Sequence, residues 1–211
     1  MNYYIKFGDM TNAISVNNKQ SIFLEDFGDV IFLNQIHSDL GKIIYNKQES
    51  FLESGDYLFT NQQNMAIGVL TADCLPIIIV DKVKNACSAV HAGWRGSVNN
   101  ITINATNEFL INGSKLQDLL YYFGPCIGVC CYEVSKDFIG NLKYFTTLKY
   151  IDQKIYFDLL EYNTILLTQL GVKYNQINLE NWHCTFCSNN YYSYRKNNET
   201  KMRQFSIVKI L

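Results

Sequence analysis

Three side chains of metal-binding type stand where strands are expected to end. Cys74 and His91 lie in residues 71–96, TADCLPIIIVDKVKNACSAVHAGWRG, and His37 follows an earlier apolar run. Two imidazoles and a thiolate suit zinc, and a zinc ion with three protein ligands keeps its fourth position for water or substrate. The same Cys74 could instead be a nucleophile with His91 as its base. Buried Cys and His residues are also common as plain packing, so spacing leaves all three interpretations open.

A second group of candidate ligands lies near the C-terminus. His183, Cys184 and Cys187 include a C-x-x-C pair, which is typical of half a structural zinc site or of a redox dithiol. The second C-x-x-C of a zinc ribbon is missing, and the adjacent Cys130 and Cys131 could contribute only with awkward geometry. We therefore expect free thiols in a packed loop.

Two arginines are candidates for anion binding. Arg95 and Arg195 each follow an aromatic residue in an expected turn, and a fixed guanidinium there could bind phosphate or carboxylate through two hydrogen bonds. The alternative is a surface arginine stacked on a ring. Asp73, beside Cys74, is either a carboxylate that meets a substrate or a ligand, or a turn-forming residue.

The elements that must position these residues are buried strands. Residues 65–70 and 76–80 are almost entirely apolar, which predicts strands covered on both faces. Between them TADCLP ends in Pro76, which donates no backbone hydrogen bond and disfavours helix at the preceding residue. We therefore expect the sheet ladder to break at residues 71–74, where several candidate residues lie.

The rest of the chain alternates weaker strands with a few helices. The clearest helix begins with the D-x-x-E pattern of Asp158 and Glu161 and stops at Gly171. A second helix is expected from an N-cap at Ser97 to Gly113, and a short third helix over 132–142. Further strands are expected around a turn at 38–41, at 119–123, near 177 and at 205–210. Residues 1–30 are weakly patterned, with edge strands at 3–7 and 21–27 and a loop at 9–20.

The length of the chain favours a single domain, and its composition gives a net charge close to zero. The chain has 211 residues, and its eighteen basic and nineteen acidic residues give a net charge of -1 without long runs of either sign. Neither nucleic acid nor a membrane surface is therefore expected as a partner. Without a signal-like stretch and with an odd number of cysteines, seven, we expect a cytoplasmic protein with reduced thiols. A monomer or homodimer is expected.

Several motifs occur in an order that is typical of one family. They are QIH at 35–37, TADCLP, HAGWRG, GPCIGVCCYEV and CTFCSNNYYSYR. Together they resemble the YfiH-like purine nucleoside phosphorylase family, also called the laccase-domain or polyphenol oxidase-like family. The resemblance implies an α/β (α+β) fold, a single-domain sandwich of mixed β-sheets flanked by helices. It also implies that His37, Cys74 and His91 bind Zn²⁺.

The resemblance further implies an activity and a set of site residues. Members of that family cleave purine nucleosides with phosphate to the base and ribose 1-phosphate, and some also deaminate adenosine or act on methylthioadenosine. Purine nucleoside and phosphate are thus the implied ligands. The resemblance implies one domain over residues 1–211, and the candidate catalytic residues are Cys74, Asp73 and Arg95. The candidate substrate-binding residues are Gln35, Thr71, Arg95, Glu133 and Arg195, with Asp73 or Glu133 handling protons at the purine.

The chain also departs from the family pattern. Residues 1–30 are a shortened and atypical N-terminal segment, in which the T-R-x-G-G-x-S pattern of the family has no match. The family pattern T-G-R-Q is replaced by TKMRQ at 200–204, and Ser38 stands where glycine is usual. Three histidines are too few for the copper centres of a multicopper oxidase, so the laccase name does not describe the expected chemistry. Two alternatives remain. One is a metal-free Cys-His hydrolase or deamidase, and the other is a non-enzymatic metal-binding or cell-wall quality-control factor.

Overall fold

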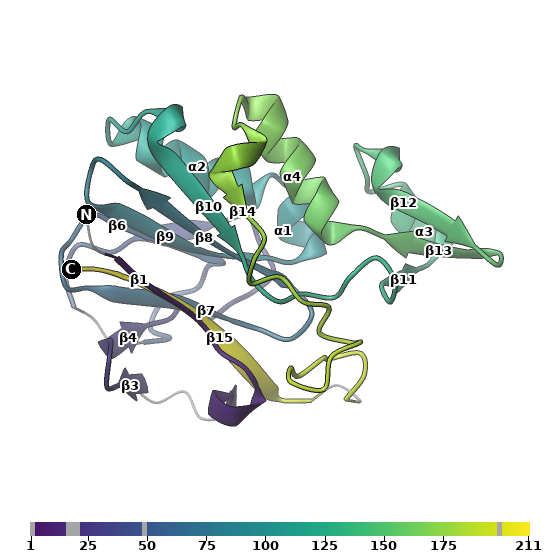
Figure 1. Cartoon of the computed structure of the whole chain (residues 1–211), viewed down its shortest axis with the longest axis horizontal. Coiled ribbons are helices and arrows are strands. Elements are labelled where there is room, and N and C mark those ends of the chain that lie inside the picture. The colour runs from purple at the N-terminus through teal and green to yellow at the C-terminus, as the bar shows by residue number, and fades with distance from the viewer. Residues whose placement is uncertain (1–2, 16–21, 48–49, 198–199) are drawn as a thin grey trace.

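The computed structural model describes residues 3–15, 22–47, 50–197 and 200–211. Two six-stranded sheets lie face to face, and α1, α2 and α4, at Trp94–Val98, Ile101–Ile111 and Leu159–Leu170, lie on the same side of the sandwich (Figure 1). The predicted α/β (α+β) sandwich of mixed β-sheets flanked by helices is confirmed.

Sheet I contains β1 (Tyr3–Phe7), β2 (Ile14–Ser15), β3 (Ile22–Leu24), β4 (Gly28–Ile31), β7 (Ala66–Thr71) and β15 (Met202–Ile210), in the order β1-β15-β7-β4-β3 with β2 also on β15. Sheet II contains β5 (Gly41–Ile43), β6 (Tyr57–Thr60), β8 (Leu75–Asp81), β9 (Ala86–Ala92), β10 (Leu119–Phe123) and β14 (Ile177–Asn178), in the order β14-β10-β8-β9-β6-β5. A small third sheet is formed by β11 (Glu133–Val134), β12 (Leu148–Ile151) and β13 (Lys154–Phe157), and the short helix α3 is Lys136–Ile139.

The central strands explain the continuous apolar runs of the sequence. In β8, Ile78 and Val80 join Ile67 and Val208 of sheet I in the core between the sheets. The alternate residue Ile77 belongs to the other large core cluster, which contains side chains of α2 and α4. Every residue of β7, β8 and β9 is buried, as expected of strands that are covered on both faces.

Helix α4 begins and ends as its sequence predicts. The Asp158 carboxylate accepts the backbone N–H of Glu161 at 3.0 Å, and Gly171 ends the helix with a φ of 105°. An N-cap bond of this kind stabilises a helix by about 0.5–2 kcal/mol. The left-handed φ at its end is one that glycine adopts without steric cost.

Two other predicted helices are shorter than expected. The helix from Ser97 divides into α1 and α2 because Asn100 between them adopts a φ of 67°, which is not helical. Ser97 thus lies inside α1, and its hydroxyl accepts a hydrogen bond from the Asn163 amide at 2.9 Å. The region 132–142 contains β11 and only the four residues of α3, since pairing of β11 with β13 overrides the local helical pattern.

The strand ends that carry the candidate residues lie together. β7 ends at Thr71 and β8 begins at Leu75, so the predicted break in the ladder falls at 72–74. Pro76 lies in β8 opposite His91 of β9, and its carbonyl accepts the N–H of Gly124 at 3.0 Å. A proline this close to the start of a strand needs no donor of its own.

The N-terminal region contains more regular structure than predicted. β1 is an edge strand of sheet I, as expected, whereas the predicted loop at 9–20 contains a 3₁₀ turn (Met10–Asn12) and β2. The rest of that loop and the start of the predicted strand 21–27, at 16–21, lie outside the described residues. Among the described helices, none combines the length and apolarity that crossing a membrane requires.

Gly41 in β5 permits the close approach of Tyr57 in β6. A Cβ at position 41 would lie 2.2 Å from Cε2 of the Tyr57 ring, which is buried and whose hydroxyl donates to Glu108 at 3.1 Å. Because Gly41→Ala must displace that ring, we expect it to lower the free energy of unfolding by about 1–3 kcal/mol, measured by urea denaturation. Gly140→Ala is the control, since the nearest atom to its Cβ is 3.8 Å away. Equal destabilisation by both substitutions would contradict this packing.

Candidate active site

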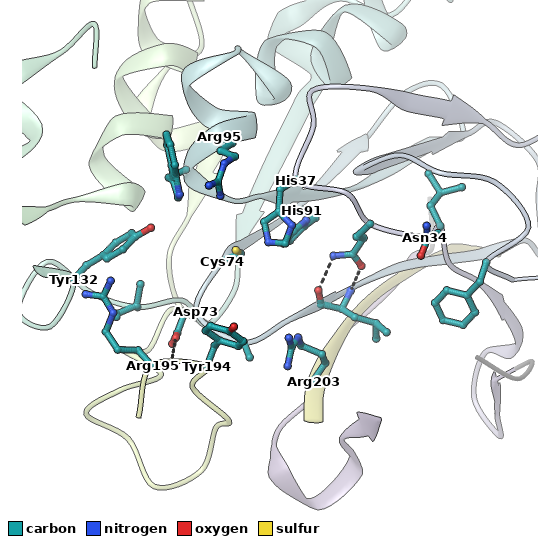
Figure 2. Close-up of a pocket in the computed structure, with 17 residues that line it drawn as sticks. Asn34, His37, Asp73, Cys74, His91, Arg95, Tyr132, Tyr194, Arg195 and Arg203 are labelled. Carbon is teal, nitrogen blue, oxygen red and sulfur yellow. Dashed lines mark hydrogen bonds between the residues drawn. The ribbon is translucent and has the colours of Figure 1, made fainter. Parts of the chain in front are cut away.

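The three residues predicted as zinc ligands converge in space (Figure 2). His91 lies in β9, Cys74 in the break between β7 and β8, and His37 in the segment before β5. Their ligand atoms lie within 4.8 Å of one another, and the two imidazole centroids are 4.9 Å apart. His37 is exposed and His91 is only 3% exposed, so the cluster extends from the core to the surface.

A buried carboxylate that sequence reasoning missed holds this cluster in place. Asp56 is fully buried and its Oδ1 lies 2.8 Å from Nδ1 of His91. Its two oxygens also accept the backbone N–H groups of Ile36, His37 and Ser38, at 3.3, 3.0 and 2.6 Å. The only local signal was an aspartate between a turn glycine and the apolar strand YLFT.

The charges of Cys74 and His91 depend on each other. Burial favours the neutral forms, but the charge of His91 and hydrogen bonds from His37 and His91 outweigh it and lower the pKa of Cys74 to about 6. Burial likewise opposes the imidazolium, but Cys74 and Asp56 raise the pKa of His91 to about 9. Burial would raise the pKa of Asp56, yet the hydrogen bonds from His91 and Ser38 lower it. Without a metal, the pair is therefore a thiolate beside an imidazolium near neutral pH.

The backbone around the cluster is constrained. His37 and Asp73 have left-handed φ values of 59° and 87°, which are uncommon outside glycine and concentrate at functional sites. Gly93, directly after β9, passes close to the cluster. A Cβ there would lie 3.0 Å from Sγ of Cys74 and 3.4 Å from Cδ2 of His37, so a larger residue would press on two candidate ligands.

The donor set fits a zinc ion. Two imidazoles and a thiolate within 4.8 Å are the ligand types and the count of an open zinc site. Asp56 on Nδ1 of His91 leaves Nε2 of that ring as the donor to a metal, which is the usual carboxylate–histidine–metal arrangement. Cys74 is half-buried and lines a cavity, so it is accessible to an ion.

The cluster lies in a cavity of about 610 Å³, within the size range of small-molecule sites. Three arginines also line it, and Figure 2 shows Arg95, Arg195 and Arg203 approaching from different sides. The guanidinium of Arg95 stacks on Trp94 at 4.4 Å. Burial lowers the pKa of the Arg203 guanidinium, although an arginine stays charged at neutral pH. The cavity is thus positively charged beside two imidazoles and a thiol.

One wall of the cavity is fastened by Asp73. Its carboxylate accepts the hydroxyl of Thr185 at 2.7 Å and the backbone N–H of Arg195 at 2.9 Å. The Arg195 guanidinium stacks on the Tyr132 ring at 5.0 Å and donates to the Glu133 carbonyl at 2.6 Å. The C-terminal loop is therefore tied both to the break after β7 and, through Tyr132 and Glu133, to the start of β11.

The remaining predicted substrate-binding residues differ in position. Gln35 lines the cavity, but its amide is used by the backbone of Leu70, donating at 2.7 Å and accepting at 2.7 Å. Thr71 is buried and is not part of the lining. The Glu133 carboxylate lies outside the cavity, 2.9 Å from Nζ of Lys154. The structure does not bring Thr71 or the Glu133 side chain to the cavity.

The lining also includes residues to which the sequence assigned no binding role. Tyr132, Tyr194 and Arg203 all line the cavity, and Arg203 belongs to the departing segment 200–204. Tyr132 and Tyr194 offer aromatic rings on the side of Arg195 (Figure 2). The position of Tyr132 in the GPCIGVCCYEV motif was the one signal that could have identified it.

Comparison with known proteins gives consistent matches along the whole chain. A family model described as multi-copper polyphenol oxidoreductase laccase matches residues 1–211. A purine nucleoside phosphorylase of Borreliella burgdorferi is 33% identical over 195 residues, which cover 88% of this chain and 82% of that protein. Adenosine deaminase RL5, from an unknown prokaryotic organism, is 31% identical over 177 residues, which cover 77% of this chain and 67% of that protein.

A solved structure shares the fold. The hypothetical protein YfiH of Bacillus licheniformis superposes with a TM-score of 0.84, covering 99% of this chain and 93% of that chain at 20% identity. Both kinds of match agree with the motifs in the sequence. The chain therefore belongs to the YfiH-like, laccase-domain family.

Proposed function

We propose that this protein is a zinc-dependent purine nucleoside phosphorylase that converts adenosine or inosine and phosphate to the base and ribose 1-phosphate. The observation that carries the proposal is the convergence of His37, Cys74 and His91 in a cavity that three arginines also line. The names of the relatives support it, and adenosine deamination and cleavage of methylthioadenosine belong to the same proposal.

Phosphate binding is assigned to Arg95. Arg203, whose Nη1 donates to the carbonyls of Thr200 and Met202, adds a second positive charge to the cavity. No hydrogen bond to the Arg95 guanidinium is found within the described residues, and its stacking on Trp94 fixes its plane. A guanidinium of fixed orientation binds phosphate through paired N–H groups, which positions the nucleophile. The bound phosphate attacks C1′ of the ribose, and the C–N bond to the purine breaks as positive charge develops on the sugar. The purine keeps the electron pair of that bond and takes up a proton from water to leave as the free base.

Metal binding is assigned to His37, Cys74 and His91. When bound, zinc supplies a Lewis acid with a free coordination position. Asp56 fixes the ring orientation of His91 and, through the backbone of residues 36–38, the position of His37. We assign Asp56 as a positioning residue for both imidazoles.

Asp73 is also assigned as a positioning residue. Both of its oxygens accept hydrogen bonds from the C-terminal loop, so its carboxylate holds Thr185 and Arg195. The Glu133 carboxylate pairs with Lys154 outside the cavity and is therefore not a suitable proton carrier. The rings of Tyr132 and Tyr194 line the cavity, and we assign them to stack against the purine.

A metal-free cysteine hydrolase is the second candidate function. Cys74, His91 and Asp56 lie in the order nucleophile, base and orienting carboxylate, and the pKa of Cys74 is lowered to about 6. The two functions use the same thiolate in different ways, because a thiolate that coordinates a metal is not free to attack a substrate. Metal content therefore separates them.

The first prediction concerns the reaction itself. Purified protein incubated with adenosine and phosphate should release adenine and ribose 1-phosphate, and chromatography should show no adenine when phosphate is omitted. Inosine or hypoxanthine would report the deaminase activity. Cys74→Ala should abolish metal binding at this cluster and lower kcat/KM by more than about 100-fold, since even outer residues of a metal site contribute 10–100-fold.

Cys87→Ala is the matched control for this substitution. Cys87 is a buried thiol of β9 in the core between the sheets, away from the cavity lining, so its loss should leave metal content and activity unchanged. Wild-type protein that holds metal but converts neither adenosine nor inosine, with or without phosphate, would refute the proposed activity.

The second prediction concerns phosphate. Arg95→Ala removes a charged hydrogen-bond donor, so we expect the KM for phosphate to rise about 10-fold or more, with a smaller change in the KM for adenosine. Arg95→Lys should recover only part of the loss, because an ammonium lacks the paired N–H groups. Lys115→Ala, which removes an exposed cation outside the cavity lining, is the control. An unchanged phosphate KM in Arg95→Ala would exclude this role.

The third prediction uses the reactivity of the Cys74 thiol. In metal-free protein, alkylation by iodoacetamide should increase with pH around a midpoint near 6, because His91 favours the thiolate below the ordinary value of 9.0. His91→Gln should move the midpoint toward that ordinary value. Added zinc should protect Cys74, as followed by mass spectrometry of its peptide. Activity that survives metal removal but is lost on alkylation would favour the cysteine hydrolase.

A further inference from the structure

Four thiols gather on the surface outside the cavity lining. Cys130 and Cys131 lie in the turn before β11, and Cys184 and Cys187 lie in the loop after β14. Cys130 and Cys187 are exposed, and the other two are half-buried. The sequence predicted free thiols in a packed loop, but side chains this exposed contribute little to packing. Their convergence therefore calls for another explanation.

The spacing of the sulfur atoms is that of ligands around one ion. The Sγ–Sγ distances are 3.6 Å for Cys130–Cys131, 3.7 Å for Cys130–Cys184, 3.6 Å for Cys130–Cys187 and 3.3 Å for Cys131–Cys187, and all four sulfurs lie within 4.8 Å of one another. Zinc–sulfur bonds of about 2.3 Å in a tetrahedron separate the sulfurs by about 3.8 Å. A disulfide requires about 2.0 Å. The three distances from Cys130 are close to the tetrahedral separation, the Cys131–Cys187 distance is somewhat shorter, and all four are far longer than a disulfide bond.

We propose that Cys130, Cys131, Cys184 and Cys187 bind one structural zinc ion. Four thiolates complete the tetrahedral shell, which leaves no position for water or substrate and distinguishes this site from the three-ligand cluster in the cavity. Each thiol loses its proton on binding. The proposal is independent of the proposed enzymatic activity, because it concerns separate residues and a structural role.

The backbone holds the two cysteine pairs together without the ion. The N–H of Cys126 donates to the carbonyl of His183 at 3.1 Å, and the N–H of Thr185 donates back to Cys126 at 3.0 Å. The N–H of Gly128 donates to Sγ of Cys184 at 3.2 Å, which is a bond that stabilises a metal-bound thiolate. The site is therefore preformed by a short bridge between distant segments.

A glycine at position 128 leaves room for the sulfurs. A Cβ there would lie 3.2 Å from Sγ of Cys130 and 3.3 Å from Cβ of Cys184. The tight turn of residues 128–131, with the N–H of Cys131 donating to Gly128 at 2.9 Å, brings two adjacent cysteines to the same side. The sequence predicted that the adjacent Cys130 and Cys131 could bind one ion only with awkward geometry, and this turn provides a geometry in which both sulfurs face the same site.

The proposed ion would fasten a wall of the cavity. The loop that contains Cys184 and Cys187 also carries Thr185, which lies between them, and Tyr194 and Arg195, which follow them. Asp73 binds both Thr185 and Arg195, and Tyr194 lines the cavity. Tyr132 directly follows Cys131 and also lines the cavity. One ion bound at the four cysteines would thus restrain both sides of the contact between Tyr132 and Arg195. Its role is to order the wall.

Metal counting tests the proposal. Full-length protein produced with zinc in the medium should contain two zinc ions per chain by elemental analysis. The double substitution Cys184→Ser and Cys187→Ser should leave one, His37→Ala with Cys74→Ala should also leave one, and Cys87→Ala should leave two. One zinc per wild-type chain that disappears with the cavity substitutions, or full zinc content in the double cysteine variant, would overturn the proposal.

Thiol protection in the wild-type protein keeps the test decisive if the double variant does not fold. Native protein loaded with zinc is alkylated, digested and mapped by mass spectrometry. We expect Cys130, Cys131, Cys184 and Cys187 to be protected together and to become reactive when zinc is removed by a chelator under reducing conditions. Free reactivity of these exposed thiols with zinc present, or disulfides among them in freshly purified protein, would overturn the four-cysteine site.

Discussion

The carboxylate of Asp56 is the interaction on which the candidate active site depends. It is fully buried, and it bonds the imidazole of His91 on a central strand together with three consecutive backbone N–H groups at residues 36–38. A buried charge is tolerated when it is fully hydrogen-bonded, and removing its partners is strongly unfavourable. The same group therefore specifies the turn at His37, the orientation of His91 and the side on which the two rings meet.

Ser38 shows how a departure from the family pattern is accommodated. The family usually has glycine at this position, but here the Ser38 hydroxyl donates to Asp56 at 2.7 Å and accepts the N–H of Leu40 at 3.2 Å. The side chain thus adds a donor to the buried carboxylate and closes the turn that presents His37. The substitution is compatible with the three-ligand cluster, since it strengthens the anchor and leaves the ring of His37 free.

Short sequence patterns predicted the helices and strands, whereas contacts between residues far apart in the sequence determine the arrangement of the candidate site. The cap of α4 by Asp158 and the apolar runs of β7 and β8 depend on neighbours in sequence, so they could be read directly. The contact of Asp56 with His91 depends on the pairing of β6 with β9, and the place of Tyr132 depends on the C-terminal loop. No short pattern encodes such contacts. The motifs identified the three candidate ligands but not the groups that orient them.

Asp73 explains why the break between β7 and β8 matters beyond the thiol that follows it. A residue with a φ of 87° is strained unless its surroundings hold it, and here both carboxylate oxygens are bound by the C-terminal loop. The backbone that presents Cys74 and the loop that presents Arg195 are thus fixed by one side chain. A zinc ion at the four cysteines would fasten the same loop around Thr185, which Asp73 also binds, and order in the cavity wall would then be linked to the position of Cys74. A cavity assembled from loop segments acquires its rigidity from such cross-links, since the loops themselves have little regular structure.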